Sequence, residues 1–249
     1  MASQDAEETG DWVTVLTTIP TLPLPANTER PLVETERLVL RALTEDDLPV
    51  FHELRSRPRV MRFTKRGAAD EDIDYTRGRL TPFLPPNDIK TFNYAICLRA
   101  AGENKLIGVG GVHLFRSSIG WPEVGYMLHD DHWGKGYATE FLHAFVKAYS
   151  ALPRPDKPVP LRVTRDSLPA DVGASIVGDG DDASTAPVVD EMLMATVADR
   201  NGASQKVIAK GGFEKYKSRT EPEWSNPALD VLLHYYRYLP GRAAFGSEQ

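Results

Sequence analysis

One segment of this chain contains a strand, a turn and the start of a helix in direct succession. It reads EVGYMLHDDHWGKGYATE, residues 123–140. The pattern predicts a strand that ends near His129, a turn that contains Gly134 and Gly136, and an amphipathic helix over residues 138–149. Such a junction points unpaired backbone N–H groups outward at the positive end of the helix dipole, and its glycines let a ligand approach closely. The segment therefore predicts an anion site, best suited to a phosphate or pyrophosphate.

Two common nucleotide-binding motifs do not fit this segment. A P-loop requires Gly-x-x-x-x-Gly-Lys-Ser/Thr, which the run from Gly134 to Gly136 does not supply. The Rossmann fingerprint Gly-x-Gly-x-x-Gly fails because Thr139 stands at the position of the third glycine. An ordinary strand-to-helix turn without a ligand is the alternative interpretation.

The flanking sequence predicts a mixed sheet with helices packed on it. Residues 92–98 and 106–115 have strand patterns with short, turn-rich connections, which favours an antiparallel meander with the strand over 123–129. The predicted fold class is α+β, with a largely antiparallel central sheet flanked by helices. The other expected elements are helices from 45, over 70–84 and over 202–210, and strands over 35–42, 191–197, from 213 and over 231–238.

Changes in composition predict the domain boundaries. Residues 1–31 contain several prolines and no periodic apolar pattern, so they are interpreted as an N-terminal arm. Residues 32–240 form the patterned domain, and 241–249 form a C-terminal tail. Within the domain, residues 152–190 are rich in proline and aspartate and can bury little surface. We expect a long, disordered-looking insertion there, with room for one short strand at 159–163.

Composition also excludes several classes of protein. The 249 residues include 29 Lys and Arg against 35 Asp and Glu, and the formal charge of −6 argues against a general nucleic-acid binder. The single cysteine, Cys97, excludes an intrachain disulfide framework. No apolar run is long enough to span a membrane, and the first ten residues carry no basic leader. We expect a cytoplasmic monomer or homodimer that binds neither nucleic acid nor membrane.

Two clusters of charged residues have ordinary explanations. The run from His129 to His132 contains metal-ligand residue types, but no remote ligand pattern accompanies it, so a solvated turn is favoured and no metal is expected. Five arginines between the early helices could attract an acidic acceptor or a phosphate, although a solvated basic loop is the favoured interpretation. They are Arg55, Arg57, Arg59, Arg62 and Arg66.

Three segments occur in an order that matches a known family. They are ETERLVLR at 34–41, WGKGYA at 133–138 and NGASQKVIAKGGF at 201–213. In this order they resemble the opening strand, the acetyl-CoA pyrophosphate loop and the late helix of the GCN5-related N-acetyltransferase (GNAT) superfamily. The resemblance is strongest to the branch of the ribosomal-protein alanine N-acetyltransferases, and it extends over residues 31–239. Asp131 stands where the superfamily usually has Gln or Arg, so we expect reshaped cofactor contact rather than its loss.

The resemblance implies a GNAT-like sheet and acetyl-CoA as the co-substrate. Backbone groups of the strand over 123–129 would pair with the pantetheine arm, and one N–H near Met127 or Leu128 would face the thioester oxygen. Lys135 is expected to lie in solvent, with an inward orientation as the alternative. The implied cofactor-binding residues are Met127, Leu128, His129, Trp133, Gly134, Lys135, Gly136, Tyr137, Ala138, Thr139, Asn201 and Ser204.

An acetyl acceptor must present a neutral amine, and this determines the need for a base. At pH 7.4 a lysine-like amine is about a thousandth neutral, a penalty of roughly 4 kcal/mol, whereas an α-amine costs under about 1 kcal/mol. Glu123 is the candidate base, since carboxylates on this strand often serve that purpose in the superfamily. It shares one strand face with Gly125 and Met127. The alternative is a salt bridge at the strand edge.

A departing thiolate needs a hydrogen-bond donor. Many superfamily members have a Tyr seven residues after the position of Asn201, but Ile208 stands there in this chain. A Ser takes over in the branch that the chain resembles, so Ser204 is the candidate donor. Its alternative is an ordinary residue in the first helical turn after the cap. Tyr216 is a second candidate donor.

These features predict an acetyl-CoA-dependent N-acetyltransferase. The acetyl group would move to a primary amine by direct attack in a ternary complex, because no convincing covalent nucleophile is present. The acceptor would be a small-molecule amine or the N-terminus of a protein. A non-catalytic acyl-CoA-binding sensor or scaffold is the alternative.

Overall fold

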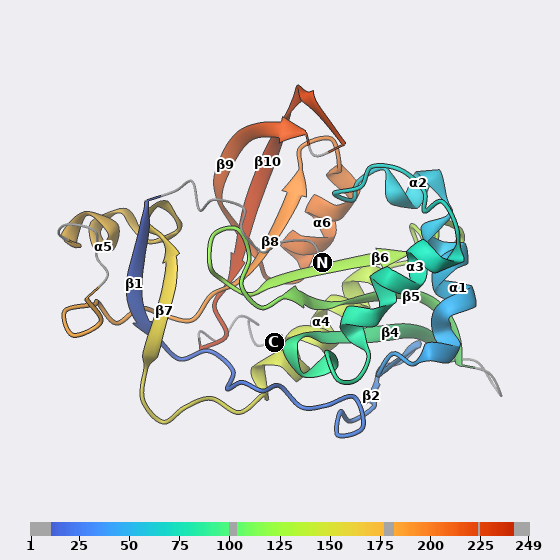
Figure 1. Cartoon of the computed structure of the whole chain (residues 1–249), viewed down its shortest axis with the longest axis horizontal. Coiled ribbons are helices and arrows are strands. Elements are labelled where there is room, and N and C mark those ends of the chain that lie inside the picture. The colour runs from blue at the N-terminus through green and yellow to red at the C-terminus, as the bar shows by residue number, and fades with distance from the viewer. Residues whose placement is uncertain (1–10, 100–103, 177–181, 224, 242–249) are drawn as a thin grey trace, which may run out of the picture.

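The computed structural model describes residues 11–99, 104–176, 182–223 and 225–241 (Figure 1). One sheet in this part of the chain has eight strands, in the order β2-β3-β4-β5-β6-β8-β10-β9, and a second sheet has two. The strands of the large sheet are β2 Val33–Glu34, β3 Leu38–Arg41, β4 Phe92–Arg99, β5 Asn104–Leu114, β6 Glu123–Leu128, β8 Leu193–Ala198, β9 Glu214–Glu223 and β10 Asn226–Tyr238.

Neighbouring strands of the large sheet run antiparallel except β6 and β8, which run parallel. Strands β4, β5 and β6 form the predicted meander. The predicted α+β fold with a largely antiparallel central sheet is therefore confirmed. The one parallel pair lies in the middle of the sheet, where the candidate site is found.

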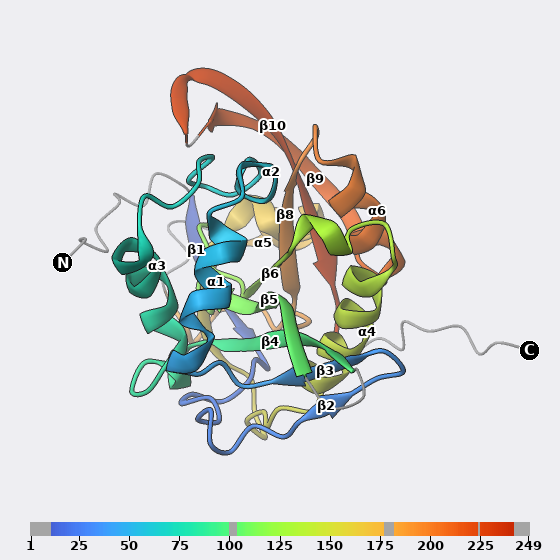
Figure 2. The ribbon, with the colours of Figure 1, turned by 90° about the vertical axis from the view of Figure 1, so that its right-hand side faces the viewer.

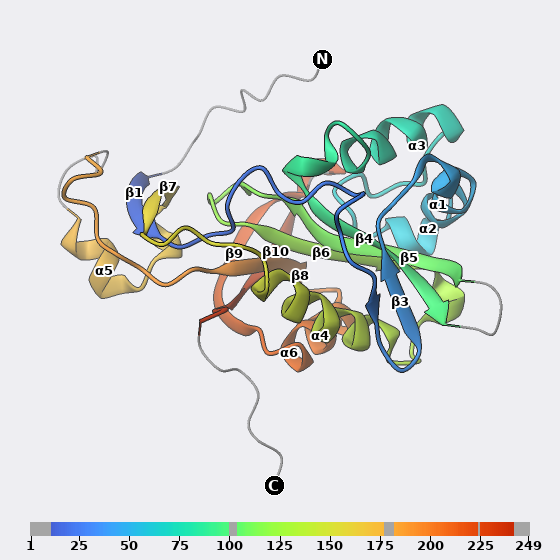
Figure 3. The same cartoon turned by 90° about the horizontal axis from the view of Figure 1, so that it is seen from below.

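Helices cover both faces of this sheet (Figures 2 and 3). Helices α1, α2 and α3 lie on one face, and α4 and α6 lie on the other. The predicted helix over 70–84 is shorter than expected, because a 3-10 turn, Thr81–Phe83, replaces its last part. No helix in the described ranges is both long and apolar enough to cross a membrane. The bounds are α1 Leu48–Arg55, α2 Pro58–Met61, α3 Ile73–Leu80, α4 Tyr137–Ser150 and α6 Gly202–Lys210.

Aromatic side chains of α4 form the centre of the main core. Phe141, Phe145 and Tyr149 are fully buried and stack in succession, with ring centroids 5.6 Å and 6.2 Å apart. Tyr94 from β4 meets Phe145 edge-on at 6.4 Å. The spacing of four residues places all three rings on the face of α4 that packs on the sheet. This packing fixes the position of the N-terminus of α4 relative to β6.

The arm and the insertion pair with each other. Strand β1 in the arm and strand β7 in the insertion form the small antiparallel sheet, and β7 lies where the sequence left room for one short strand. Val13 lies opposite Val163, Val15 lies opposite Leu161, and all four are buried. The pairing buries alternate apolar side chains that neither strand could bury alone. The bounds are β1 Trp12–Thr17, β7 Val159–Thr164 and α5 Ala170–Ser175.

The small sheet is attached to the large one just before β6. The buried Trp121 donates its indole N–H to Ser167 Oγ at 2.9 Å. Lys217 on β9 forms an ion pair with Asp166. The arm and the insertion therefore support the loop that leads into the candidate site. Parts of the arm, the low-complexity run and the tail, namely 1–10, 177–181 and 242–249, lie outside the described residues.

One arginine of the basic cluster is buried rather than solvated. Arg55 donates Nε to Asp70 Oδ2 at 2.6 Å, and the exposed fractions of the two side chains are 7% and 0%. Asp70 also accepts a hydrogen bond from Thr76 Oγ1 at 2.9 Å. The interpretation as a solvated basic loop is therefore wrong for Arg55, because burial requires a partner for its charge.

We expect Asp70→Ala to destabilise the fold by about 3 kcal/mol or more, because it leaves the Arg55 guanidinium buried without a counter-charge. Urea unfolding of the variant and the wild type measures the difference. Asp74→Ala is the matched control, since its side chain is 87% exposed and lies 3.8 Å from Arg77. Equal stability of the two variants would contradict a structural role for the buried pair.

Candidate active site at the gap between β6 and β8

The glycine turn that was predicted to bind an anion lies at the N-terminus of α4. Gly134 and Gly136 have φ angles of 74° and 83°, in the region that favours glycine, and Gly136 is the N-cap residue of α4. In the described structure, none of the five backbone N–H groups of residues 134–138 donates a hydrogen bond to another residue. Successive N–H groups in a glycine turn at the positive end of a helix dipole form an anion-binding cradle.

An ion pair that the sequence analysis missed supports this turn. Glu140, one turn into α4, accepts hydrogen bonds from Thr35 Oγ1 at 2.6 Å, from Arg37 N at 2.9 Å and from Arg37 Nε at 2.7 Å. Arg37 also donates to the Lys135 carbonyl at 2.9 Å. Burial acts to raise the pKa of Glu140, but the bonds from Thr35 and Arg37 outweigh it and hold that pKa below its usual range. The turn is thus anchored to the residues just before β3.

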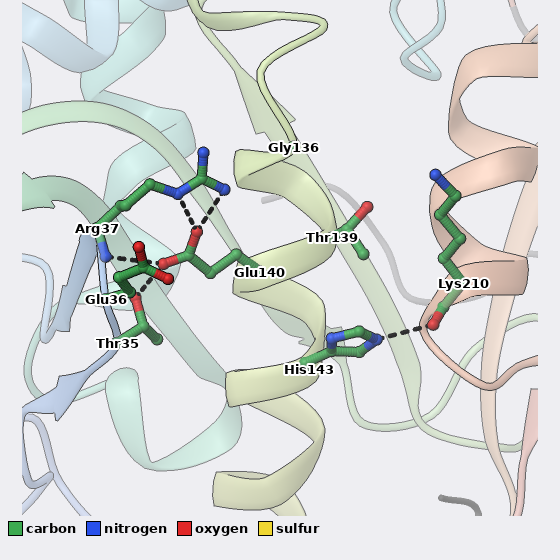
Figure 4. Close-up of a pocket in the computed structure, with 8 residues that line it drawn as sticks. All are labelled: Thr35, Glu36, Arg37, Gly136, Thr139, Glu140, His143 and Lys210. Carbon is green, nitrogen blue, oxygen red and sulfur yellow. Dashed lines mark hydrogen bonds and ion pairs between the residues drawn. The ribbon is translucent and has the colours of Figure 1, made fainter. Parts of the chain in front are cut away.

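A pocket of about 410 Å³ lies beside this ion pair (Figure 4). The close-up shows Arg37 and Glu140 on one side of α4 and Lys210 on the other, with the first turns of the helix between them. His143 Nε2 donates to the Lys210 carbonyl at 2.7 Å, which joins α4 to α6. The lining residues are Thr35, Glu36, Arg37, Gly136, Thr139, Glu140, His143 and Lys210.

We expect Glu140→Gln to weaken acetyl-CoA binding about fivefold, because loss of the charge-assisted bonds frees Arg37 and loosens the turn at Lys135. Calorimetric titration with acetyl-CoA measures the dissociation constant. Glu34→Gln is the control, since its 56% exposed side chain lies 3.7 Å from Arg99. An unchanged affinity in Glu140→Gln would show that the ion pair does not organise the cradle.

Strands β6 and β8 separate immediately after they meet. Their only registered pair in the described chain is Glu123 with Met194, next to a hydrogen bond of 2.9 Å from Met194 N to Pro122 O. Beyond that point the two strands diverge toward their C-terminal ends (Figure 1). Beyond Glu123, the edge of β6 that faces β8 therefore offers backbone groups that no neighbouring strand pairs with.

Strand alternation identifies which backbone groups face this gap. His129 N donates to Ile107 O at 2.8 Å, and β5 and β6 pair with Met127 opposite Val109. Because bonded pairs alternate in an antiparallel ladder, the Met127 N–H points to β5 and the Leu128 N–H points into the gap. The Leu128 carbonyl, on the same edge, accepts from Trp133 Nε1 at 2.8 Å. The sequence alone did not distinguish the N–H of Met127 from the N–H of Leu128 as the group that would face the thioester oxygen.

Glu123 lies at the closed end of the gap. Glu123 is 8% exposed, and its side chain has no hydrogen bond or ion pair with another described residue. The alternative of a salt bridge therefore has no support within the described chain. His113 on β5 lies on the same face, since a Cβ built on Gly125 would come within 3.0 Å of its ring. Burial lowers the pKa of His113 despite the opposing charge of Glu123, so the imidazole is neutral at pH 7.

Tyr216, the second candidate donor, is on the Glu123 side of the site. Its hydroxyl is buried without a hydrogen-bond partner in the described structure. Burial, followed by the charges of Asp166 and Glu123, raises the pKa of Tyr216 well above its usual value. It therefore stays protonated, and the charge of the candidate base acts on it.

Ser204 lies on the opposite face of β6, where it contacts a tyrosine that the sequence analysis did not single out. The Tyr126 hydroxyl and Ser204 Oγ are 2.9 Å apart. Asn201 caps α6 by accepting a bond from Ser204 N at 3.2 Å, so Ser204 is also a first-turn helix residue. Burial raises the pKa of Tyr126 to about 12, and the hydrogen bond to Ser204 opposes the shift. The strand parity of Tyr126 predicts the face of β6 on which its side chain lies, but it does not predict the contact with Ser204.

The other predicted cofactor residues surround the turn. Ala138 and Tyr137 form the first turn of α4, and the Arg37 guanidinium lies 4.8 Å from the Tyr137 ring. Thr139 lines the pocket of Figure 4. Lys135 Nζ donates to the Asp131 carbonyl at 2.9 Å, in an exposed position as expected.

His129, Asp130 and Asp131 are engaged in a network of charged side chains. Their potential ligand atoms lie within 4.8 Å of one another. Asp130, however, is paired with Arg57 at 2.8 Å and with Arg59 at 3.4 Å. These pairs join α2 and its flanking residue to the start of the glycine turn. They account for the acidic cluster, and our expectation that no metal binds there stays a prediction.

The fold is that of an acetyltransferase domain. The profile of the acetyltransferase (GNAT) domain matches residues 37–214. The chain therefore belongs to the GNAT family, and it is an acyltransferase with acetyl-CoA as its co-substrate.

Two curated relatives carry the same class name. The chain is 28% identical over 116 residues to the uncharacterized N-acetyltransferase p20 of Bacillus licheniformis, a match that covers 45% of this chain and 62% of p20. It is 30% identical over 125 residues to the uncharacterized N-acetyltransferase YoaA of Bacillus subtilis, covering 49% of this chain and 68% of YoaA. The match thus spans less than two thirds of p20.

Solved structures show the same fold at lower identity. A GNAT acetyltransferase from Bacillus anthracis superposes with a TM-score of 0.58 at 20% identity, covering 85% of this chain and all (100%) of that chain. The CoA complex of RimL, a ribosomal L7/L12 α-N-protein acetyltransferase, gives 0.58 at 15%, covering 84% and 98%. Spermidine N-acetyltransferase from Vibrio cholerae, with CoA and spermine bound, gives 0.55 at 16%, covering 83% and 97%. At these identities the likeness establishes the fold alone.

Proposed function

We propose that the chain transfers the acetyl group of acetyl-CoA to a primary amine by direct attack in a ternary complex. The observation that carries the proposal is the arrangement of three features along β6. Unpartnered N–H groups of residues 134–138 follow its C-terminal end, its edge toward β8 has no strand pairing after Glu123, and the buried Glu123 lies at its start. An anion site at one end and a base candidate at the other are what this reaction requires.

The described residues fit the co-substrate. The N–H groups of residues 134–138 would hold the pyrophosphate, and the open edge of β6 at Tyr126 and Leu128 would pair with the amide-containing arm like an added strand. Asp131, which departs from the family pattern, has a side chain that is 71% exposed. It can therefore turn toward solvent, and this supports reshaped contact rather than its loss.

Acetyl-CoA, when bound, supplies an activated thioester. The Leu128 N–H would donate to the acyl oxygen, where negative charge develops. Glu123 would accept the proton from the amine, directly or through a water, and the neutral His113 would lie beside it. Ser204, on the other face of β6, would donate a hydrogen bond to the departing sulfur. Base and donor candidates on opposite faces of one strand suit an amine that arrives from one side while the thiolate leaves on the other.

The acceptor is best tested with a panel of amines. Thiol release from acetyl-CoA should depend on added amine, and a polyamine, an amino sugar and a peptide with a free N-terminus represent the acceptor classes. We expect at least one class to be acetylated at a primary amine. Binding of acetyl-CoA without release by any amine would favour the sensor alternative, and absence of binding would contradict the proposal altogether.

A further inference from the structure

A pair of hydroxyl groups connects β6 with α6, the helix that follows β8 along the chain. Tyr126 extends from β6 and Ser204 from the first turn of α6, and their oxygens are 2.9 Å apart. The Tyr126 ring packs on Phe141 of α4 with centroids 6.1 Å apart, so the phenol has a fixed direction. The backbone of Ser204 is fixed as well, because Asn201 Oδ1 accepts a hydrogen bond from its N–H. The two residues are therefore held beside each other.

The chemistry of the two groups determines the direction of the bond. A phenol is a better hydrogen-bond donor than an aliphatic hydroxyl, and the Tyr126 hydroxyl has no other partner among the described residues. Tyr126 therefore donates to Ser204 Oγ. The hydrogen of Ser204 is then available to an acceptor in the gap, and hydrogen bonds in such a chain strengthen one another.

We propose that Tyr126 is a positioning residue that orients and polarises the Ser204 hydroxyl toward the departing sulfur. This rests on the proposed function. When the amine nitrogen forms its bond to the acyl carbon, the carbon–sulfur bond breaks and its electron pair stays on sulfur as a thiolate. Ser204 donates a hydrogen bond to that thiolate, and neither hydroxyl loses its proton. The amine proton passes to Glu123 and then to water, and the thiolate takes a proton from water after it leaves.

The test is a double-mutant cycle with Tyr126→Phe and Ser204→Ala. We expect Tyr126→Phe to lower kcat about tenfold and to leave the acetyl-CoA dissociation constant unchanged within about twofold. The reason is that the substitution weakens a hydrogen bond to the thiolate that forms only during the reaction. In the Ser204→Ala background the same substitution should have no further effect on kcat, because the phenol acts only through Ser204.

The control is Tyr94→Phe, which removes a buried hydroxyl that has no hydrogen-bond partner in the described structure. It should leave kcat unchanged. A merely structural bridge would instead weaken acetyl-CoA binding, lower the unfolding free energy, and give additive effects in the double mutant. Additive effects, or an unchanged kcat in Tyr126→Phe, would overturn this inference.

Failure of the proposed function has a different signature. In that case the wild-type protein would not release thiol with any amine. Amine-dependent release by the wild type, together with unchanged kcat in Tyr126→Phe, overturns only the role of Tyr126.

Discussion

Glu123→Gln is expected to lower kcat for an alkyl amine about 100-fold, within the range for loss of a general base. The glutamine keeps the size of the side chain and its buried position at the end of the gap, but it cannot accept a proton. A lysine-like amine carries a penalty of roughly 4 kcal/mol for neutralisation at pH 7.4, and the base reduces that penalty. Acetyl-CoA affinity should be unchanged, since Glu123 lies beyond the cradle.

The pH profile separates a base from a structural residue. The loss in Glu123→Gln should be largest at pH 6.5 and smaller at pH 9, because more of the amine is then neutral in solution. Glu214→Gln is the matched control, since its 75% exposed side chain lies on β9. If Glu123→Gln kept the wild-type rate and the wild-type pH profile, Glu123 would not be the base, and His113 would be the next candidate.

The second large effect concerns Gly136, and we expect Gly136→Val to weaken acetyl-CoA binding about 100-fold. The residue has a φ of 83°, where a side chain costs about 1–2 kcal/mol. A Cβ there would also lie 3.3 Å from the Arg37 guanidinium. If the turn relaxes to avoid this strain, the N–H groups of residues 134–138 no longer converge, and each lost bond to a charged group weakens binding by about 1.5–3 kcal/mol.

The control for this substitution is Gly78→Val. Gly78 lies in α3, and a Cβ built on it has no neighbour within 4 Å. Calorimetric titration with acetyl-CoA should give the wild-type dissociation constant for Gly78→Val. An equally high affinity in Gly136→Val would contradict the assignment of the glycine turn as the pyrophosphate site.

Local patterns in the sequence were sufficient to predict the structure of the segment that contains the candidate anion site. Residues 123–140 contain a strand pattern, two glycines and helical spacing of apolar residues. The structure has β6, the turn and α4 in that order. The late helix was predicted with its observed bounds, Gly202–Lys210. Both elements depend on neighbours within a few residues, so periodicity and caps are enough to find them.

Partners far apart in the chain could not be predicted in this way. Glu140 pairs with Arg37, and Tyr126 pairs with Ser204, yet nothing local joins them. The same applies to β1 and β7, whose partners are separated by most of the domain. Strand parity gives the face on which a side chain lies, but the element that packs on that face follows only from the fold.

The proposed anion cradle also explains why the acidic composition does not oppose a polyanionic co-substrate. The pyrophosphate is expected to meet backbone N–H groups and the dipole of α4, not a field of basic side chains. Arg37, a cation next to the turn, is itself neutralised by Glu140. Affinity should therefore depend on backbone geometry more than on net charge.

The most direct test of the account is a mass balance with the wild-type protein. Incubated with acetyl-CoA alone, the protein should release no CoA and carry no acetyl group by intact-protein mass spectrometry. After an accepted amine is added, CoA and acetylated amine should appear in equal amounts. CoA release without amine, or an acetylated side chain that forms first and is then consumed, would contradict direct transfer in a ternary complex.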